Sequence, residues 1–205
     1  MPLIKASGQA DDLWTSVKDE DQLPAEGAII VTLARWQANR DQLQARPTPL
    51  GIRLKSDQSP AAIIGDIERF DVVALEFPKF TDGRAYSSAR LLRERHGFRG
   101  ELRAVGNVLR DQLAFMRRCG FDSFQIPESA DAAAWAGSLR GISVVYQPAT
   151  DARTTALAAR HKPAPTPAQR RKVEEDEDEP APKVIAAAVE SNPEYSQVCA
   201  GYWAY

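Results

Sequence analysis

The segment EFPKFTDGRAYS, residues 76–87, places charged and turn-forming residues directly after an apolar run. The run VVALEF predicts a β-strand that ends at about Phe77, and Gly83 predicts the turn into a helix. The charged residues around this turn are Glu76, Lys79, Asp82 and Arg84. Basic side chains beside the N–H groups of a helix start favour a small anion. The segment therefore predicts a site for a small oxyanion or phosphate.

A second group of polar residues follows the strand ELRAV, residues 101–105, one strand further along the chain. Ligands of open parallel sheets bind beyond the carboxyl ends of the strands, where the loops into the helices meet. If the two strands are neighbours, both polar groups lie over one edge of the sheet. The candidate residues for binding an anion or a partner are Glu76, Lys79, Thr81, Asp82, Arg84, Arg103, Asn107, Arg110 and Asp111.

These residues also have a purely structural interpretation, which the sequence leaves open. Asp82 is a suitable helix cap, and Arg84 can form an ion pair with Glu76 or Glu101. Arg103 lies inside a strand, so its charge must be paired, and Glu101 lies on the same side of that strand. That pair either joins the strands or holds a ligand. The other charged residues of this region predict a solvated helix face, namely Arg90, Arg93, Glu94, Arg95 and Arg99.

From Gly27 onward, strand-like and helix-like segments alternate along the chain. The strands are predicted at residues 28–33, 50–55, 72–77, 101–105, 123–127 and 142–148. This order indicates an α/β fold, a mostly parallel sheet with helices on both faces built from repeated βα units. A partial βα barrel is the alternative, since both arrangements produce the same order. Before these segments, LIKA and LWTSV flank the turn-prone SGQADD, which predicts an N-terminal hairpin.

Two helices have ends that the sequence predicts. The first runs from about Gly83 to His96, where Gly97 stops it. The second runs from about Val108 to Cys119, with Asn107 as a possible cap and Gly120 in the left-handed position after it. Because Cys119 falls in the last turn beside residues that face the core, we expect a packed, inert thiol.

The composition is that of a globular protein, with 43% hydrophobic and 26% charged residues among 205. With 26 basic and 28 acidic side chains, no overall charge recruits nucleic acid or an acidic membrane. Neither a membrane span nor a signal peptide is evident, so a cytoplasmic protein is expected. The two cysteines are far apart and only two histidines occur, so no metal site is predicted. No nucleotide-binding or flavin-binding motif indicates a cofactor.

The chain changes character after Pro148, so three regions are predicted. Residues 1–150 form the α/β domain, and residues 151–183 form a disordered linker that contains the acidic block EEDEDE. Residues 184–205 are predicted to be a docking peptide, for a partner or for the domain itself, because aromatic anchors end it. Its anchor residues are Cys199, Tyr202, Trp203 and Tyr205. A mobile relay thiol is a second interpretation of Cys199.

The block ALEFPKFTDGRAYSSARLLRERHGFRGELRAVGNVLRDQLAFMRRCGFDSFQI, with MPLIK and LGIRLK, resembles the bacterial domain-of-unknown-function family 934. The resemblance covers about residues 1–148. Members are commonly described as probable oxidoreductases involved in sulfite reduction, because they are encoded beside sulfite reductase and the sulfonucleotide reductase of sulfate assimilation. The candidate residues that match the family pattern are Glu76, Thr81, Asp82, Arg84, Arg103 and Asp111. At position 107 the family often has Asp, where this chain has Asn107.

The resemblance implies a role in assimilatory sulfur metabolism and assigns no catalytic residue. The expected function is an accessory protein of sulfate and sulfite reduction, which acts with sulfite reductase or the sulfonucleotide reductase. Binding of a small oxyanion belongs to this expectation, since sulfite and sulfate suit a basic site at a helix start. The alternative is an oxidoreductase of sulfite reduction that uses the charged strand ends as its site.

Overall fold

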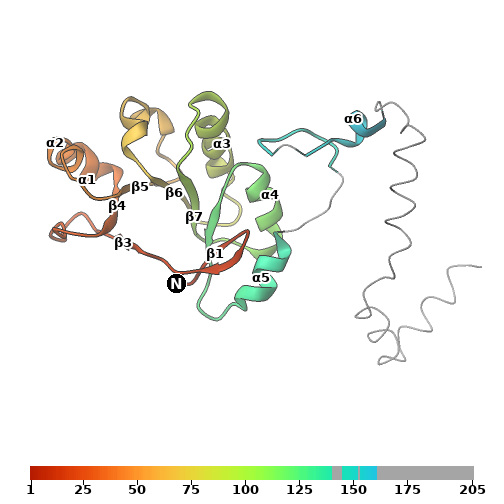
Figure 1. Cartoon of the computed structure of the whole chain (residues 1–205), viewed down its shortest axis with the longest axis horizontal. Coiled ribbons are helices and arrows are strands. Elements are labelled where there is room, and N and C mark those ends of the chain that lie inside the picture. The colour runs from red at the N-terminus through yellow and green to blue at the C-terminus, as the bar shows by residue number, and fades with distance from the viewer. Residues whose placement is uncertain (140–144, 152, 161–205) are drawn as a thin grey trace, which may run out of the picture. The chain divides into compact units, whose positions relative to one another are not determined.

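The structure of the protein is a computed structural model, and it describes residues 1–139, 145–151 and 153–160 (Figure 1). Residues 142–144 of the last predicted strand lie outside this part of the chain, as do the docking peptide and the linker from residue 161 onward. Within the range predicted as linker, Thr155 forms a bridge to Val145, and helix α6 (Ala156–Arg160) follows it.

Eight strands form one sheet with the order β2-β1-β8-β7-β6-β5-β4-β3. Strands β3 to β8 run parallel, whereas β1 is antiparallel to both of its neighbours, β2 and β8. The sheet is therefore mixed rather than purely parallel. The strands are β1 (Leu3–Lys5), β2 (Gly8–Ala10), β3 (Trp14–Ser16), β4 (Ala28–Thr32), β5 (Leu50–Leu54), β6 (Val72–Phe77), β7 (Glu101–Gly106) and β8 (Ser123–Gln125).

The N-terminal hairpin is tighter than the sequence predicts. Strand β1 pairs with β2, and Lys5 faces Gly8, which adopts a φ of 119° that favours glycine. The segment that contains Trp14 was predicted to be the second arm, and this prediction is wrong. It forms β3 at the opposite edge of the sheet, where Trp14 pairs with Ala28 of β4.

The sheet must curl, because β2 and β3 lie at its two edges while only Asp11, Asp12 and Leu13 connect them. A flat sheet of this many strands would separate its edges by about 33 Å. The four steps from Ala10 to Trp14 span at most about 14 Å. The result is a half barrel, and the connecting residues 11–13, here called the strap, cross its open side. In Figure 1 this red segment runs along the side of the sheet opposite α3.

The described helices supply apolar side chains to one face of the sheet only. The prediction of helices on both faces is therefore wrong for this part of the chain, and the partial-barrel alternative describes it better. The helices are α1 (Leu33–Ala38), α2 (Arg40–Gln44), the 3-10 helix η1 (Pro60–Arg69), α3 (Arg84–Arg90), the π-helix η2 (Leu91–Arg95), the 3-10 helix η3 (Arg110–Gln112), α4 (Leu113–Arg118) and α5 (Ala132–Ser138).

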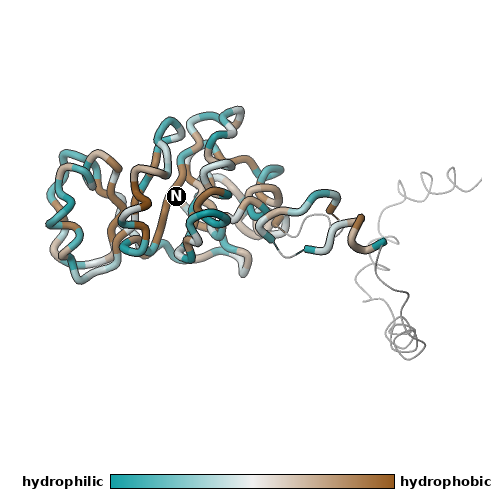
Figure 2. The backbone as a smooth tube through the Cα atoms, turned by 90° about the horizontal axis from the view of Figure 1, so that it is seen from above, coloured by the Kyte–Doolittle hydropathy of each residue, from teal (hydrophilic) through white to brown (hydrophobic). Residues whose placement is uncertain are grey.

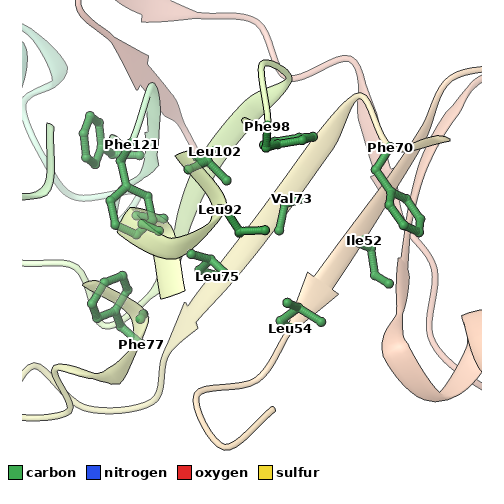
Figure 3. Close-up of a cluster of buried hydrophobic side chains, with 14 of the residues drawn as sticks. Ile52, Leu54, Phe70, Val73, Leu75, Phe77, Leu92, Phe98, Leu102 and Phe121 are labelled. Carbon is green, nitrogen blue, oxygen red and sulfur yellow. The ribbon is translucent and has the colours of Figure 1, made fainter. Parts of the chain in front are cut away.

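The main core lies between these helices and the outer, convex face of the sheet. Figure 3 shows Leu92 of η2 above β6, next to Val73. Figure 2 shows hydrophobic segments running through the middle of the domain and hydrophilic segments mostly at its margins. The inner, concave face carries a much smaller apolar cluster of Ile30, Val72, Ala74 and Val105, against which Trp14 packs. The concave face therefore has room for polar side chains.

The ends of the two predicted helices are largely confirmed. Gly97 and Gly120 adopt φ values of 62° and 105°, and both follow the last helical turns. Asn107 was a possible cap of the second helix, but that helix begins at η3, where Leu109 is the preceding residue. Asn107 instead lies in a bend directly after β7, and its N–H donates to the carbonyl oxygen of Phe77 at 2.7 Å.

Candidate functional site

The loop between β6 and α3 carries its own carboxylate at the helix start. Asp82 Oδ1 accepts a hydrogen bond from the N–H of Arg84 at 3.2 Å, and Asp82 Oδ2 lies 2.7 Å from Arg84 Nη2. Hydrogen bonds from Arg84 and Ser56 hold the pKa of Asp82 well below its usual range. Asp82 thus occupies the position predicted for an external oxyanion. Arg84 pairs with Asp82, whereas partners Glu76 or Glu101 were predicted for it.

The loop after β7 lies beside the loop after β6, since Asn107 is bonded to Phe77. Arg110, however, donates from Nε to Ser138 Oγ of α5 at 2.8 Å, away from the β6 loop. The side chains of Lys79, Thr81 and Asp111 are exposed and form no hydrogen bond or ion pair with another described residue. The structure therefore brings the two loops together but directs their arginines apart.

Aromatic side chains stand exposed beside these loops. Phe80 is 51% exposed and Phe115 is 55% exposed, although both are large and apolar. The rings of Phe115 and Tyr86 are 5.1 Å apart, and Phe80 is linked to η3 by a hydrogen bond of 3.4 Å from Gln112. Burial raises the pKa of Tyr86 to about 12, so its hydroxyl stays protonated. We call Phe80, Tyr86 and Phe115 the aromatic cluster.

The concave face carries a buried ion-pair network around Arg103, which is only 2% exposed. Its Nε lies 3.0 Å from Glu101 Oε1, and its Nη1 lies 2.8 Å from Asp12 Oδ1 on the strap. The predicted pairing with Glu101 is thus confirmed. Lys5 and Ser123 also donate to Glu101, at 2.7 and 2.6 Å. Burial alone would raise the pKa of Glu101, but these hydrogen bonds and the charge of Arg103 outweigh it and lower that pKa.

A second arginine faces the same side of the sheet. Arg53 of β5 is in register with Ala74 of β6, and Ala74 is in register with Arg103 of β7. Arg53 forms an ion pair of 3.2 Å with Glu76, so the predicted candidate Glu76 belongs to the concave face and not to the loop. A cavity of about 260 Å³ lies on this face, and Arg53, Arg103 and Trp14 line it. An adjoining cavity of about 270 Å³, lined by Arg53 and Glu76, opens toward the carboxyl ends of the strands.

The sequence interpretation missed Arg53, Asp12 and Trp14 on this face. Arg53 could have been found, because a charge inside the strand LGIRLK requires a partner by the same argument as Arg103. Asp12 and Trp14 carry no comparable pattern. Their position depends on β2 and β3 lying at opposite edges of the sheet, which local sequence does not specify.

A hollow of about 770 Å³ opens at the amino ends of the strands, and Arg93 lines it. The prediction of a solvated face is wrong for Arg93, because its guanidinium donates to the carbonyl oxygens of Gly120, Phe98 and Gly100 at 3.0, 2.6 and 2.9 Å. It also pairs with Asp122. Its position in the π-helix turns Arg93 toward these loops, a change of direction that a regular helical periodicity does not predict.

Cys119 is buried as expected, and burial raises the pKa of its thiol. Among the described residues, no group of three or more His, Cys, Asp or Glu side chains is arranged to hold a metal ion. In the same part of the chain, no helix combines the length and the hydropathy of a membrane span.

The fold and this arrangement define a class of protein, an α/β half barrel with an ion-paired concave face. The chain belongs to the family described as "Bacterial protein of unknown function (DUF934)", whose profile matches residues 51–157, just over half of its 205 residues. The predicted family is thus confirmed over residues 51–157, while the predicted resemblance of residues 1–50 lies outside the match. No curated protein matches the chain. The match contains Arg53, Arg103 and the segment EFPKFTDGR, whereas the strap precedes it.

Proposed function

We propose that this protein is an accessory protein of assimilatory sulfate and sulfite reduction, which docks on sulfite reductase or the sulfonucleotide reductase. The family resemblance supplies the link to sulfite reduction. The observation that supports docking is the aromatic cluster, since two of its phenylalanine rings are more than half exposed. The proposal includes the binding of a small oxyanion.

Exposed aromatic rings of this size favour a contact with another protein. Leaving a Phe side chain in water forgoes roughly 2 kcal/mol that burial would provide. Exposed apolar groups with a polar rim mark interaction sites, and aromatic residues dominate the binding energy of such sites. Here Lys79 and Asp111 are exposed beside the cluster and provide charges for a polar rim.

The cluster is also firmly placed. Tyr86 packs on the buried ring of Phe77 at 5.2 Å, so Tyr86 and its neighbour Phe115 rest on the main core. Phe80 lies within the segment EFPKFTDGR, on which the family resemblance depends. A rigid support reduces the conformational entropy that docking would remove, which favours binding.

The test uses the full chain with the purified reductases. A tagged protein is mixed with sulfite reductase or with the sulfonucleotide reductase, and binding is measured by biolayer interferometry. We expect a dissociation constant in the micromolar range or below for one of them, weakened at least about tenfold by the Phe80→Ala/Phe115→Ala double substitution. Leu13→Ala is the matched control, because Leu13 is a 79% exposed apolar residue on the strap.

Two outcomes contradict the proposal. One is the absence of binding to either reductase at micromolar concentrations. The other is a double variant that binds as tightly as the unchanged protein while Leu13→Ala behaves in the same way. Circular dichroism of each variant establishes that it is folded before binding is measured.

A further inference from the structure

Two arginines flank a small residue on the concave face. Arg53, Ala74 and Arg103 form one row across β5, β6 and β7, and their side chains share one side of the sheet. Adjacent strands are about 4.8 Å apart, so the two arginine backbones are separated by roughly 10 Å. The methyl group of Ala74 fills little of the space between them. This gap is part of the cavity of about 260 Å³.

The strap and the residue after it provide part of the cavity wall. Asp12 on the strap and Trp14 directly after it line the cavity together with Arg103. Gln125 of β8 adds an amide to the wall, and Ala74 and Val105 provide apolar surface. A small concave space with a few convergent polar groups and an aromatic side chain is typical of small-molecule sites.

The two carboxylates that neutralise Arg103 are held very differently. Glu101 bonds to the guanidinium and is fixed by Lys5 and Ser123. Asp12 bonds to Arg103 alone through its Oδ1, apart from a local bond to the N–H of Trp14, and it belongs to a three-residue connection. Asp12 is therefore the partner that another anion can replace at the lowest cost.

We propose that the concave cavity binds a small oxyanion between Arg53 and Arg103, where the anion replaces the carboxylate of Asp12. Planar guanidinium groups pair well with carboxylate, sulfate, sulfite and phosphate oxygens, and buried pairs of this kind are strong. The cavity volume is smaller than most sites for drug-sized molecules, so it suits an inorganic oxyanion or a short carboxylic acid.

This inference rests on the proposed function only for its preference for sulfur oxyanions. It assigns anion binding to the concave face, where the predicted candidates Glu76 and Arg103 lie, and not to the predicted candidates in the loops after β6 and β7. The aromatic cluster lies beside α3 and α4, on the helix side, so docking and anion binding involve different residues.

The test is isothermal titration calorimetry of the full chain at constant ionic strength. Sulfate, sulfite, phosphate and acetate are titrated separately, and sodium chloride serves as the control for nonspecific screening. We expect saturable binding of at least one oxyanion and none of chloride. Preference for sulfate or sulfite supports a sulfur oxyanion as the ligand. Preference for phosphate or acetate supports the same anion site with a phosphate or a carboxylate as its ligand. No saturable binding of any of the four overturns the proposal.

Two substitutions that change the anion affinity in opposite directions test where the anion binds. Arg53→Gln is expected to weaken binding about tenfold, since it removes one charge-assisted partner. Asp12→Asn is expected to tighten binding about fivefold, because it removes the competing carboxylate. Arg40→Gln is the matched control, since Arg40 is paired with Asp66 at 2.6 Å and does not line the cavity. It should bind like the unchanged protein.

A substitution that changes the shape of the cavity but not its charge tests the location of the anion site further. Ala74→Val adds bulk between the two arginines and should weaken binding about fivefold through steric exclusion. Equal affinity in Arg53→Gln and in the unchanged protein overturns the assignment, as does weaker binding in Asp12→Asn. Neither Arg53→Gln nor Ala74→Val should change docking on a reductase, and the Phe80→Ala/Phe115→Ala variant should bind the anion normally. Failure of one proposal is thereby distinguished from failure of the other.

Discussion

Two arginines, Arg93 at the amino ends of the strands and Arg103 on the concave face, are both largely buried but have different kinds of partner. Arg93 donates mainly to main-chain carbonyl oxygens of three separate residues. Arg103 donates to two side-chain carboxylates. Carbonyl oxygens move only when the backbone moves, whereas a carboxylate on a short connection can leave and be replaced.

The difference separates a structural arginine from a binding one. Arg93 joins η2 to the loops before β7 and β8, so its bonds are part of the fold. Arg103 has one fixed partner in Glu101 and one exchangeable partner in Asp12. A hollow of about 770 Å³ lies beside Arg93, but size alone does not make a site, because three of the four partners of Arg93 are main-chain carbonyl oxygens that cannot leave without a movement of the backbone.

The largest loss of stability is expected from Arg93→Ala. An unchanged stability would contradict the structural role of Arg93. The substitution removes the Arg93 donor from three carbonyl oxygens and from the carboxylate of Asp122, which keeps only its hydrogen bond from the N–H of Leu102. We expect a loss of about 3 kcal/mol in the free energy of unfolding, measured by urea denaturation. Arg99→Ala is the control, because Arg99 lines the same hollow but is exposed and should change the stability by less than about 0.5 kcal/mol.

A smaller loss of stability is expected from Gly120→Ala. Gly120 has a φ of 105°, and an added Cβ would lie 2.6 Å from Cγ of Arg93. We expect a destabilisation of about 2 kcal/mol in the same denaturation experiment. Gly137→Ala is the matched control, since Gly137 is helical and nothing lies within 4 Å of an added Cβ. That change should stabilise the protein by about 0.5 to 1 kcal/mol, and equal effects of the two substitutions would contradict the packing described here.

The concave face should respond to pH in a way that the amino-end region does not. The pKa of Glu101 is lowered in the folded protein, so its contribution to stability is complete above the usual carboxyl pKa and is lost as the pH falls through the folded value. The groups that face it are Lys5, Arg103 and Ser123, and Asp12 lies on the far side of Arg103.

The measurement is the urea midpoint between pH 6 and pH 3 for the unchanged protein and for Glu101→Gln. We expect Glu101→Gln to be less stable at pH 6 and to show a shallower decline toward pH 3. The pKa of Asp82 is also lowered in the folded protein, by hydrogen bonds from Arg84 and Ser56, so Asp82→Asn serves as a comparison outside the concave face. Parallel pH curves for Glu101→Gln and the unchanged protein would show that the Glu101 carboxylate does not stabilise the fold through its charge.

Local patterns predicted the βα order, the glycine stops at Gly97 and Gly120, and the pair of Glu101 with Arg103. They rest on residues close together in the chain, where periodicity and turn chemistry act directly. The position of the strap could not be predicted in this way, because it depends on which strands form the edges of the sheet. The same long-range strand pairing directs Glu76 to the concave face, away from the loop residues that follow it in the sequence. It also places Arg53 and Arg103 on one face, on either side of Ala74.

The smallest effect on the fold is expected from Arg84→Ala, which also tests the alternative function. Arg84 is exposed although its partners Asp82 and Ser56 are half-buried, so its loss should lower the thermal unfolding temperature only slightly. Under the accessory proposal, a deletion strain complemented with this variant should grow on sulfate at the rate of the unchanged protein, because docking uses the aromatic cluster. If the protein were an oxidoreductase that uses the charged strand ends, the strain with this variant would instead fail to grow on sulfate but would still grow on cysteine.

Arg90→Ala is the matched control, since Arg90 forms a similar exposed pair with Glu94 on the helix side. Loss of growth with Arg84→Ala but not with Arg90→Ala would favour the enzyme and contradict a purely accessory role.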